Sequence, residues 1–186
     1  MQVLGPGGIG NLSNVVAVTG GQFFTLALKS DGTVWAWGYN AFGELGNGTT
    51  TDSSAPVQVS NLSGVIAVVA HGNHGLALKN DGTVWTWGSN ADGELGNGTN
   101  TNSATPAQVS NLSGVVAISG GSVHSLALRS DGTIWAWGDN SYGELGDTTT
   151  TNRTTPVQVS GISGVTTIAG GAYHSLALKS DGSVWA

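Results

Sequence analysis

The chain of 186 residues contains no cysteine and only five lysines and arginines. Without cysteine it has no disulfide bonds, no thiolate catalyst and no cysteine-ligated metal. With so few cations and a formal net charge of -6, it lacks the basic surface that binding to nucleic acid or to an anionic membrane requires. It also lacks any run of about 18 apolar residues, the length of a membrane-spanning helix. We therefore expect neither nucleic acid nor membrane among its partners.

Glycine is what the chain has in excess. There are 31 glycines, while 39% of the residues are hydrophobic and 9% are charged. Disordered chains combine low hydrophobicity with high net charge, so this composition excludes disorder. Helical bundles are rich in Ala, Glu, Lys, Leu and Arg. The polar residues here are mainly Gly, Thr, Ser and Asn, which favour turns and strands. The composition therefore predicts an all-β protein.

A repeat of 50 residues runs through the chain from residue 11 onward without insertion or deletion. Its units are 11–60, 61–110, 111–160 and a shortened fourth unit, 161–186. Asp-Gly pairs mark each unit, at 31–32, 81–82, 131–132 and 181–182. We interpret residues 1–186 as a single repeat domain. Residues 1–10 are interpreted as a stray fourth strand and a loop, because Gln2-Val3-Leu4 resembles Gln58-Val59-Ser60.

Each unit predicts four short strands, which in the first unit cover residues 15–18, 25–29, 33–38 and 56–59. The first is an apolar run, typical of a strand buried on both faces. Asp31-Gly32 is a strong hairpin signal, because glycine tolerates positive φ. Trp35 and Trp37 share one face of the third strand, and we expect them to pack between neighbouring sheets. Pro56 lacks an N–H, which indicates a strand start or a sheet edge.

Four antiparallel strands repeated every 50 residues are typical of the blades of a β-propeller. The chain carries about 3.5 such repeats. A blade cannot bury both of its faces alone, so stability comes from stacking of blades and closure of the ring. A partial ring is therefore expected to leave two apolar blade faces exposed.

Three stretches of the third unit carry a family resemblance: GGSVHSLAL at 120–128, DGTIWAWG at 131–138 and NSYGELG at 140–146. They resemble the repeats of the regulator of chromosome condensation family, and the resemblance covers nearly the whole chain. It implies a seven-bladed propeller that strands from both chain ends close. It also implies protein–protein contacts, which in the family include guanine-nucleotide exchange and β-lactamase inhibition. This chain is far shorter than such a ring, and no insertion of the kind that exchange needs interrupts its frame.

The length of the chain predicts half a ring. The N-terminal strand and the shortened fourth unit together make one blade, which gives four blade equivalents per chain. We expect two copies to close one ring of eight blades, because a two-fold dimer needs an even blade count. The alternatives are a six-bladed dimer with displaced ends, a compact monomer, an open head-to-tail assembly, and a fragment of a longer protein.

Four histidines are the candidate binding residues. His74, His124 and His174 recur at the period, with Phe24 at the matching place in the first unit. A ring of imidazoles is a conceivable ligand set. However, the phenylalanine indicates that the position takes an aromatic filler, and the family resemblance implies a structural histidine. His71 lies where the other units have glycine, and we expect it in an exposed turn. We expect no catalytic residue, no metal and no cofactor.

The repeated carboxylates have a structural interpretation. Glu44, Glu94 and Glu144 recur in Gly-Glu-Leu-Gly motifs, and an aspartate precedes the glycine of each hairpin turn. Catalytic sites break the symmetry of a repeat, and these residues do not. We expect the glutamates to hold their loops by hydrogen bonds to backbone amides, and the aspartates to serve the turns. The sequence therefore does not predict an enzyme.

The resulting hypothesis is a non-enzymatic scaffold or protein-binding module that self-assembles as a homodimer. The alternative is a fragment of a larger bacterial propeller protein that binds another protein or a glycan through rim loops 49–55, 99–105 and 149–155. Sugar stacking on the repeated tryptophans is disfavoured, because we expect their rings to be buried. The low charge and the Thr, Asn and Gly bias fit a secreted or cell-surface bacterial protein. The N-terminal sequence MQVLGPGGIG lacks the character of a signal peptide.

Overall fold

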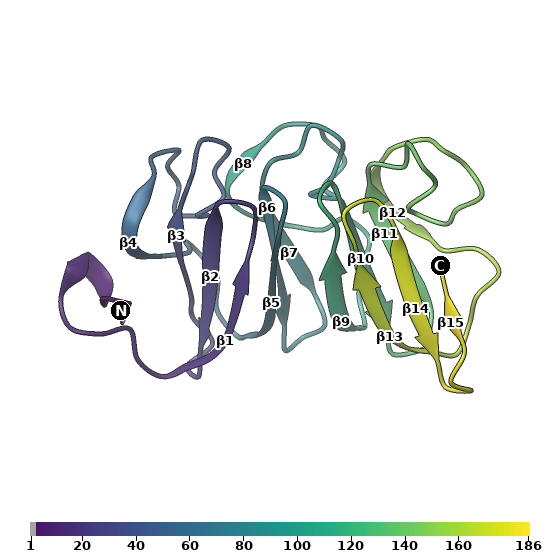
Figure 1. The fold of residues 1–186 in the computed structure, drawn as a ribbon, viewed down its shortest axis with the longest axis horizontal. Helices are drawn as coiled ribbons and strands as arrows, with labels where there is room; N and C mark the ends of the chain where they lie inside the picture. The colour runs from purple at the N-terminus through teal and green to yellow at the C-terminus, as the bar shows by residue number, and fades with distance from the viewer. Residues whose placement is uncertain (1–2) are drawn as a thin grey trace.

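The computed structural model describes residues 3–186 and consists of four antiparallel sheets, which we call blades 1 to 4 in chain order (Figure 1). Blade 1 contains β1 (Val15–Gly20), β2 (Phe24–Lys29), β3 (Val34–Gly38) and β4 (Ser53–Gln58). Blade 2 contains β5 (Val65–His71), β6 (His74–Lys79), β7 (Val84–Gly88) and β8 (Ser103–Gln108). Blade 3 contains β9 (Val115–Gly120), β10 (His124–Arg129), β11 (Ile134–Gly138) and β12 (Arg153–Gln158). Blade 4 contains β13 (Val165–Gly170), β14 (Ser175–Lys179) and β15 (Val184–Trp185).

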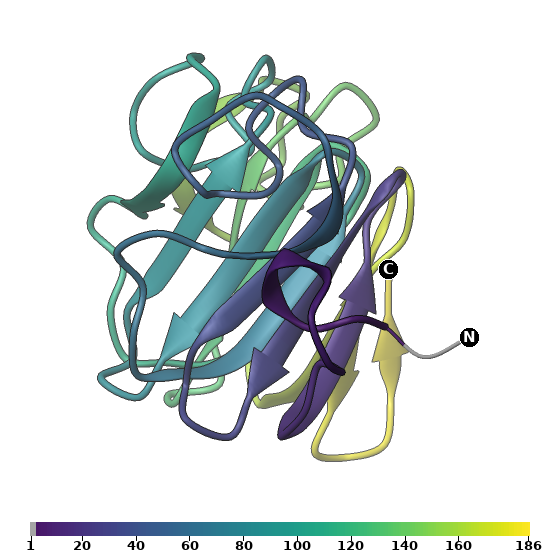
Figure 2. The ribbon, with the colours of Figure 1, turned by 90° about the vertical axis from the view of Figure 1, so that its left-hand side faces the viewer.

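The architecture is a row of propeller blades. Within each sheet the strands follow one another in sequence order, with the first strand at one edge. Neighbouring blades lie face to face, so that from the N-terminal side the sheets stand one behind another (Figure 2). The prediction of an all-β fold built from four-stranded propeller blades is confirmed. The one helical element in the described residues is a short 3-10 turn, η1 (Pro6–Gly8). No helix in residues 3–186 has the length and apolarity needed to cross a membrane.

The Asp31-Gly32 turn connects β2 to β3 and is also hydrogen-bonded to the start of blade 2. The Asp31 carboxylate accepts hydrogen bonds from the backbone N–H and the hydroxyl of Thr33, at 3.0 and 2.6 Å. Gly32 has a φ of 77°, a conformation that glycine adopts without strain. The Gly32 carbonyl accepts a bond from the Val65 N–H at 3.3 Å, where the next blade begins. The expected turn role of these aspartates is confirmed, and the first three turns also hold the start of the following blade.

The prediction that the first strand of each unit is buried on both faces is wrong. Val16, Ile66 and Val116 are all more than half exposed. Each lies at a β-bulge, because its two neighbours pair with the second strand while it has no partner in the register. A bulge adds one residue to its strand and turns that side chain away from the sheet. The apolar run of the first strand therefore contains one residue whose side chain points to solvent in each of blades 1 to 3.

The fourth strand is longer than the sequence predicts, and it contains its proline. β4 begins at Ser53, three residues before Pro56, and lies at the outer edge of its sheet. An edge position leaves one side of the strand free of ladder hydrogen bonds, so the missing N–H costs nothing there. The edge assignment of Pro56 is thus confirmed.

The N-terminal segment folds back on the start of blade 1. Leu4 forms an antiparallel bridge with Asn11, and the Leu12 N–H donates to the Val3 carbonyl at 3.1 Å. Gln2, which begins the strand-like motif, lies outside the described residues. The use of residues 1–10 as a fourth strand for a fourth blade remains a prediction.

Candidate functional site

Each junction between successive blades is an apolar cluster built from the same positions of the repeat. At the first junction, Leu26, Leu28 and Val34 of blade 1 belong to one cluster with Ala77 and Trp87 of blade 2. The second and third junctions repeat this arrangement 50 and 100 residues later, at the positions still present in blade 4. The leucines of the second strand therefore face the following blade, while the alanine between them faces the preceding one.

The second tryptophan of each third strand reaches into the preceding blade. Trp87 and Trp137 are fully buried. Their Nε1 atoms donate to the backbone carbonyls of Glu44 and Glu94, at 2.8 and 2.7 Å. Trp37 has no preceding blade in this chain and is only half-buried. The predicted packing between blades is confirmed for Trp87 and Trp137, so their rings are closed to stacking with a sugar.

Two of the four candidate histidines lie inside the blade junctions. His74 is fully buried, and its Nε2 lies 3.1 Å from the Ser125 hydroxyl of the next blade. That hydroxyl donates its single proton to the Glu94 carbonyl at 2.9 Å, so Nε2 must carry the imidazole proton and donate to the serine oxygen. His124 makes the same contact with Ser175, at 3.1 Å.

The buried histidines are held neutral. Burial, together with the nearby imidazoles of His124 and His71, lowers the pKa of His74 to about 3. Burial lowers the pKa of His124 to about 4. Their Nδ1 atoms are buried without a hydrogen-bond partner. Phe24 fills this place in blade 1. Blade 2 has Gly75 where blade 3 has Ser125, and an added Cβ on Gly75 would lie 2.6 Å from the Trp87 ring. His74 and His124 therefore pack and hydrogen-bond between blades. His174, on the last blade, is exposed.

His71 is half-buried, which differs from the exposed turn that its sequence position predicts. At the matching place in blade 3, a side chain on Gly121 would overlap the His124 ring. Blade 2 avoids this clash with a different turn: β5 extends to His71, which pairs with His74, and Gly72 takes a φ of 45°. Burial lowers the pKa of His71. The replacement of glycine by histidine predicted an exposed turn residue, but it did not reveal that the turn itself differs.

The turns between first and second strands gather around a cavity of about 420 Å³, which His71 lines with neighbours from the other blades. The residues that line it include Gln22 of blade 1, Asn73 of blade 2, Ser122 of blade 3 and Tyr173 of blade 4. Within residues 3–186, no group of three or more His, Cys, Asp or Glu side chains is placed to hold a metal ion. The structure thus brings His71, His74 and His124 near one another at the junctions without forming such a cluster.

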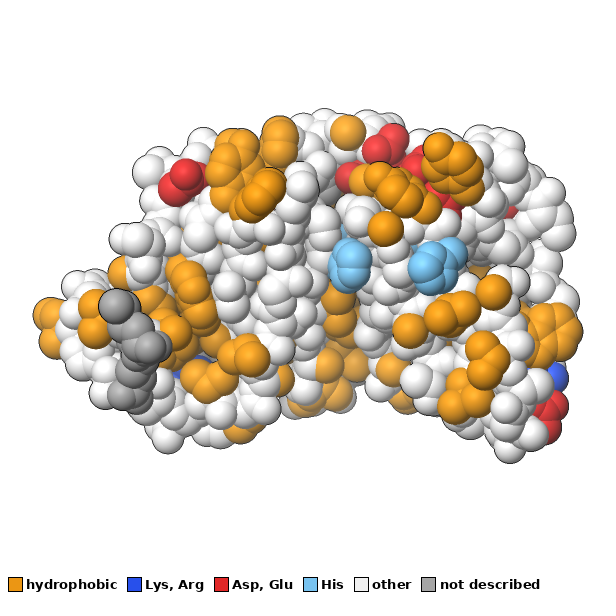
Figure 3. Space-filling model, viewed as in Figure 1, with side chains coloured by type: hydrophobic (Ala, Val, Ile, Leu, Met, Phe, Trp, Pro, Cys, Tyr) orange, Lys and Arg blue, Asp and Glu red, His pale blue; other side chains and the backbone are white. Residues whose placement is uncertain are grey.

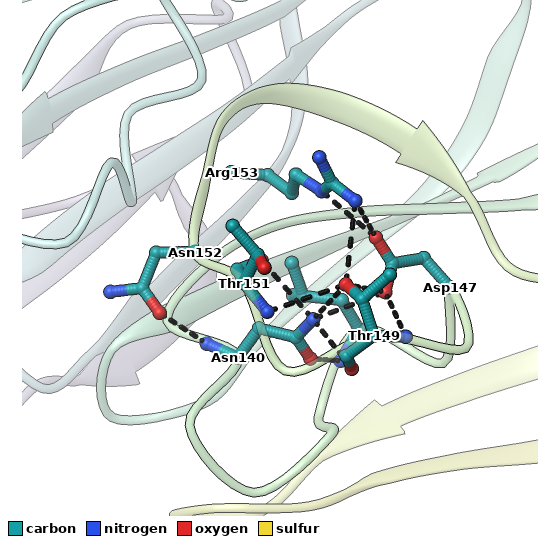
Figure 4. A network of polar contacts seen from close by, with 7 residues as sticks. Asn140, Asp147, Thr149, Thr151, Asn152 and Arg153 are labelled. Carbon is teal, nitrogen blue, oxygen red and sulfur yellow. Dashed lines mark hydrogen bonds and ion pairs between the residues drawn. The ribbon is translucent and has the colours of Figure 1, made fainter.

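The loop between third and fourth strands is organised by a buried asparagine (Figure 4). The Asn140 Oδ1 accepts a bond from the Leu145 N–H at 3.0 Å. Its Nδ2 donates to the Thr149 and Thr151 carbonyls, at 3.0 and 3.2 Å. Asn40 and Asn90 make equivalent bonds in blades 1 and 2. The sequence interpretation did not single out these asparagines, although their spacing of 50 residues was the available signal.

The conserved spacing of the loop glutamates has the expected cause. The Glu144 carboxylate accepts a bond from the Tyr142 N–H at 2.8 Å, and Glu44 and Glu94 do the same two residues back in their own loops. The predicted role of these glutamates in holding loops through backbone amides is confirmed. Burial raises the pKa of Glu44 and of Glu94.

One rim loop carries an ion pair that the others lack. Arg153 donates to the Asp147 carboxylate from Nε and from an Nη, at 2.8 and 2.6 Å (Figure 4). Burial opposes ionisation of Asp147, but hydrogen bonds from Thr149 and Arg153 outweigh it and lower the pKa to about 2. Blades 1 and 2 have Asn47 and Asn97 at the place of Asp147, and Ser53 and Ser103 at the place of Arg153, so their loops lack this two-point contact.

Two groups of exposed aromatic side chains lie on the same face. Phe23, Tyr39 and Phe42 form an edge-to-face chain with ring centroids 6.3 and 6.2 Å apart. Tyr142 and Tyr173 form a second pair at 5.9 Å, which joins blade 3 to blade 4. Figure 3 shows two hydrophobic clusters at the upper edge of this face, with acidic side chains beside them. We call these five residues the aromatic rim.

The comparisons with known proteins agree with this architecture. The model of the RCC1-like domain matches residues 3–186. The chain belongs to the RCC1-like family. A stretch of 50 residues, 26% of this RCC1-like chain, is 46% identical to 11% of the ultraviolet-B receptor UVR8 of Arabidopsis thaliana.

Solved structures of longer chains have the same fold. Human WBSCR16 superposes with a TM-score of 0.82 at 25% identity, over 94% of this chain and 48% of its own. Yeast RCC1 (Prp20) superposes with a TM-score of 0.81 at 24% identity, over 94% of this chain and 44% of its own, which bears on the fold alone. This RCC1-like chain therefore spans less than half the length of these solved relatives.

The two outer blades leave apolar positions of the repeat uncovered. Leu176, Leu178 and Val184 of blade 4 are 36%, 38% and 68% exposed. Their counterparts in blade 3, which blade 4 covers, are at most 5% exposed. At the other end, Val18 of blade 1 is 68% exposed while its counterpart Ile168 is 9% exposed. The expectation that a partial propeller exposes two apolar faces is confirmed. We call these the blade 1 face and the blade 4 face.

Proposed function

We propose that this RCC1-like chain is a non-enzymatic protein-binding scaffold whose first partner is a second copy of itself. The observation that carries the proposal is the exposure of Leu176, Leu178 and Val184 on the blade 4 face, at positions buried in every internal junction. The blade 1 face offers what an internal junction offers to such leucines, namely Trp37 and Val18. Burying these faces against each other removes apolar surface from water at about 25 cal/mol per Å².

The geometry of closure is a further part of this proposal. Two copies would form two identical junctions related by a two-fold axis, in a ring of about eight blades. Residues 1–10 of one copy would supply the fourth strand beside β15 of the other, and blades 1 to 3 would keep the boundaries 11–60, 61–110 and 111–160. In the single chain Leu4 is bridged to Asn11 and the Val3 carbonyl accepts the Leu12 N–H, so this pairing would use the other edge of the segment.

A charge placed on the blade 4 face tests the proposal. Leu178→Asp should convert the chain to a monomer, because an unpaired carboxylate cannot be buried in an apolar junction. Tyr142→Ser on the aromatic rim is the matched control and should leave the assembly intact. Light scattering at micromolar concentration reads out both. The proposal fails if Leu178→Asp and the wild-type chain have the same mass.

The aromatic rim favours a second candidate function, binding of another protein. Exposed aromatic pairs of this kind anchor interfaces, because they bury large rigid surfaces. Among relatives, yeast RCC1 (Prp20) has been crystallised bound to Kap60, and Prp20p has binding properties toward Gsp1p and histones. In this candidate function, the chain is a fragment of a larger bacterial propeller protein. Its rim and loops 49–55, 99–105 and 149–155 would then contact the partner.

Paired variants distinguish a rim partner from a glycan. Phe23→Ser with Phe42→Ser should abolish capture of a protein partner by the immobilised chain, while Leu178→Asp should leave it unchanged. Screening the same proteins against a glycan array reveals a sugar ligand instead. Identical capture by wild-type and rim-variant chains would exclude the rim as the interface.

A further inference from the structure

The net charge of the chain is confined to one end of its blades. Every lysine and arginine pairs with an aspartate nearby in the sequence. Four of these five pairs lie at the turns between second and third strands, and the fifth joins Arg153 to Asp147. The carboxylates that remain account for the formal net charge of -6. All of them lie in the loops between third and fourth strands, namely Glu44, Asp52, Asp92, Glu94, Asp139 and Glu144.

These loops and the Asp-Gly turns lie at opposite ends of each blade, because the third strand runs antiparallel to the second. The turn end carries its charges as neutral pairs, whereas the loop end is acidic. Figure 3 shows acidic side chains gathered along the upper edge, beside the hydrophobic clusters of the aromatic rim. A positively charged partner is therefore attracted to the loop end, over a range of about 8 Å at physiological ionic strength.

Two of the carboxylates lie between the aromatic groups of the rim. Asp92 occupies in blade 2 the repeat position that Phe42 and Tyr142 occupy in blades 1 and 3. Asp139 occupies in blade 3 the repeat position of Tyr39 in blade 1. Blades 2 and 3 each have a neighbouring blade on both sides, so the surroundings of these two aspartates do not depend on the outer faces.

The two aspartates are held by neutral donors. Asp139 is 8% exposed, and its Oδ1 accepts bonds from the N–H and the hydroxyl of Ser141, at 3.2 and 2.7 Å. Asp92 accepts a bond from the Asn152 Nδ2 of the next loop, at 3.1 Å. Burial and the charge of Asp139 raise the pKa of Asp92. Two partly buried like charges are each stabilised by an opposite charge nearby, and every lysine and arginine of the chain already pairs with another aspartate.

An exposed ring lies in the same loop as Asp139. Tyr142 follows it by three residues and is 78% exposed, while its backbone N–H is held by the Glu144 carboxylate at 2.8 Å. Guanidinium groups stack on aromatic faces and form forked hydrogen bonds with carboxylates, which an ammonium group cannot do. A surface that combines an exposed ring with two carboxylates is therefore better suited to arginine than to lysine.

From these observations we propose that the aromatic rim binds an arginine-containing segment of another polypeptide. The guanidinium lies between Asp92 and Asp139 with the Tyr142 ring beside it, and hydrophobic side chains of the segment pack on the aromatic group of blade 1. Charge complementarity selects this partner, because the loop end carries the whole net charge of the chain. This proposal rests on the proposed function of the rim as a protein-binding surface and adds the chemistry of its partner. It does not require self-association.

Selection from a peptide library tests the surface on the whole chain. Random peptides displayed on phage are selected on the immobilised wild-type chain, and peptides that also bind the Phe23→Ser, Phe42→Ser variant are discarded. We expect the retained peptides to be enriched in arginine over the unselected library. Retained peptides without this enrichment overturn the arginine proposal and leave the rim as a binding surface. If no peptide is retained, the binding function of the rim fails, and the arginine proposal fails with it.

Matched charge changes then locate the arginine. The most enriched peptide is labelled with a fluorophore and its binding is followed by fluorescence anisotropy. Replacing its arginine with citrulline, which keeps the shape but removes the charge, should weaken binding by about tenfold or more. Asp139→Asn keeps the Oδ1 acceptor and should cause a similar loss in the chain. Asp81→Asn, in an ion pair at the turn end, is the control and should leave affinity unchanged.

Equal affinity for the arginine and citrulline peptides would overturn the proposal. Equal loss of affinity in Asp139→Asn and Asp81→Asn would overturn the placement of the arginine at the rim. The citrulline comparison uses the wild-type chain, so it decides even if Asp139→Asn does not fold.

Discussion

Replacing Trp137 with alanine is expected to lower the free energy of unfolding by about 3–5 kcal/mol, the usual loss for a large buried aromatic side chain. The Trp137 ring is fully buried between blades 2 and 3 and donates to the Glu94 carbonyl at 2.7 Å. Removing it leaves both a cavity and an acceptor with one partner fewer. Urea unfolding followed by circular dichroism, at a concentration where light scattering gives the mass of a single chain, measures the loss.

Trp37→Ala is the matched control for this prediction. Trp37 occupies the same position in blade 1, but no blade precedes it and its ring is half-buried. Its removal should cost the single chain about 1 kcal/mol, as for an ordinary partly buried substitution. It should weaken self-association, because Trp37 lies on the blade 1 face. Equal losses of stability in the two variants would show that the tryptophans do not act through the blade junctions.

Acidification from pH 7 to 4.5 is expected to destabilise the fold through its two buried histidines. The pKa values of His74 and His124 are lowered to about 3 and about 4, first by burial, while an unfolded histidine titrates near pH ~6.5. Below that pH the unfolded chain binds protons that the folded chain excludes. The free energy of unfolding should fall by about 1.4 kcal/mol per pH unit for each histidine, once the pH is below ~6.5 and until it nears the folded pKa.

The buried glutamates act in the opposite direction. Burial raises the pKa of Glu44 and of Glu94, so their contribution favours folding at low pH and is lost as the pH rises through the raised values.

A His74→Gln, His124→Gln double variant keeps a side-chain N–H donor but cannot titrate, and should flatten the pH dependence of the free energy of unfolding between pH 6.5 and 4.5. His174→Gln, at an exposed position, is the control and should keep the wild-type slope. An unchanged slope in the double variant would contradict the buried, neutral state of these histidines.

The local features that repeat were predictable from the sequence. Asp31-Gly32 is a hairpin signal that depends on neighbouring residues alone, and the structure has that turn. The burial of Trp87 and Trp137 followed from the alternation of a strand together with the stacking of blades. The loop role of Glu144 followed from its recurrence in each complete unit, since a polar residue that repeats with the blade is expected to stabilise the blade itself.

The features that could not be predicted depend on contacts between units. The outward turn of Val16 comes from a bulge, and an unbroken apolar run hides where the extra residue lies. The turn at His71 differs from that of blade 3, where a side chain on Gly121 would overlap the His124 ring, and the sequence alone does not show this packing. The aromatic rim joins Phe23 to Tyr39, and Tyr142 to Tyr173, across loops whose mutual approach only the fold defines.

Our central proposal is that the two outer faces of this row of RCC1-like blades pair with those of a second copy. The mass of the wild-type chain in solution, measured by sedimentation equilibrium across micromolar concentrations, tests it most directly. We expect a species of twice the 18.6 kDa chain mass that dissociates on dilution. A mass of 18.6 kDa at every concentration, with Leu178→Asp indistinguishable from the wild type, would contradict it.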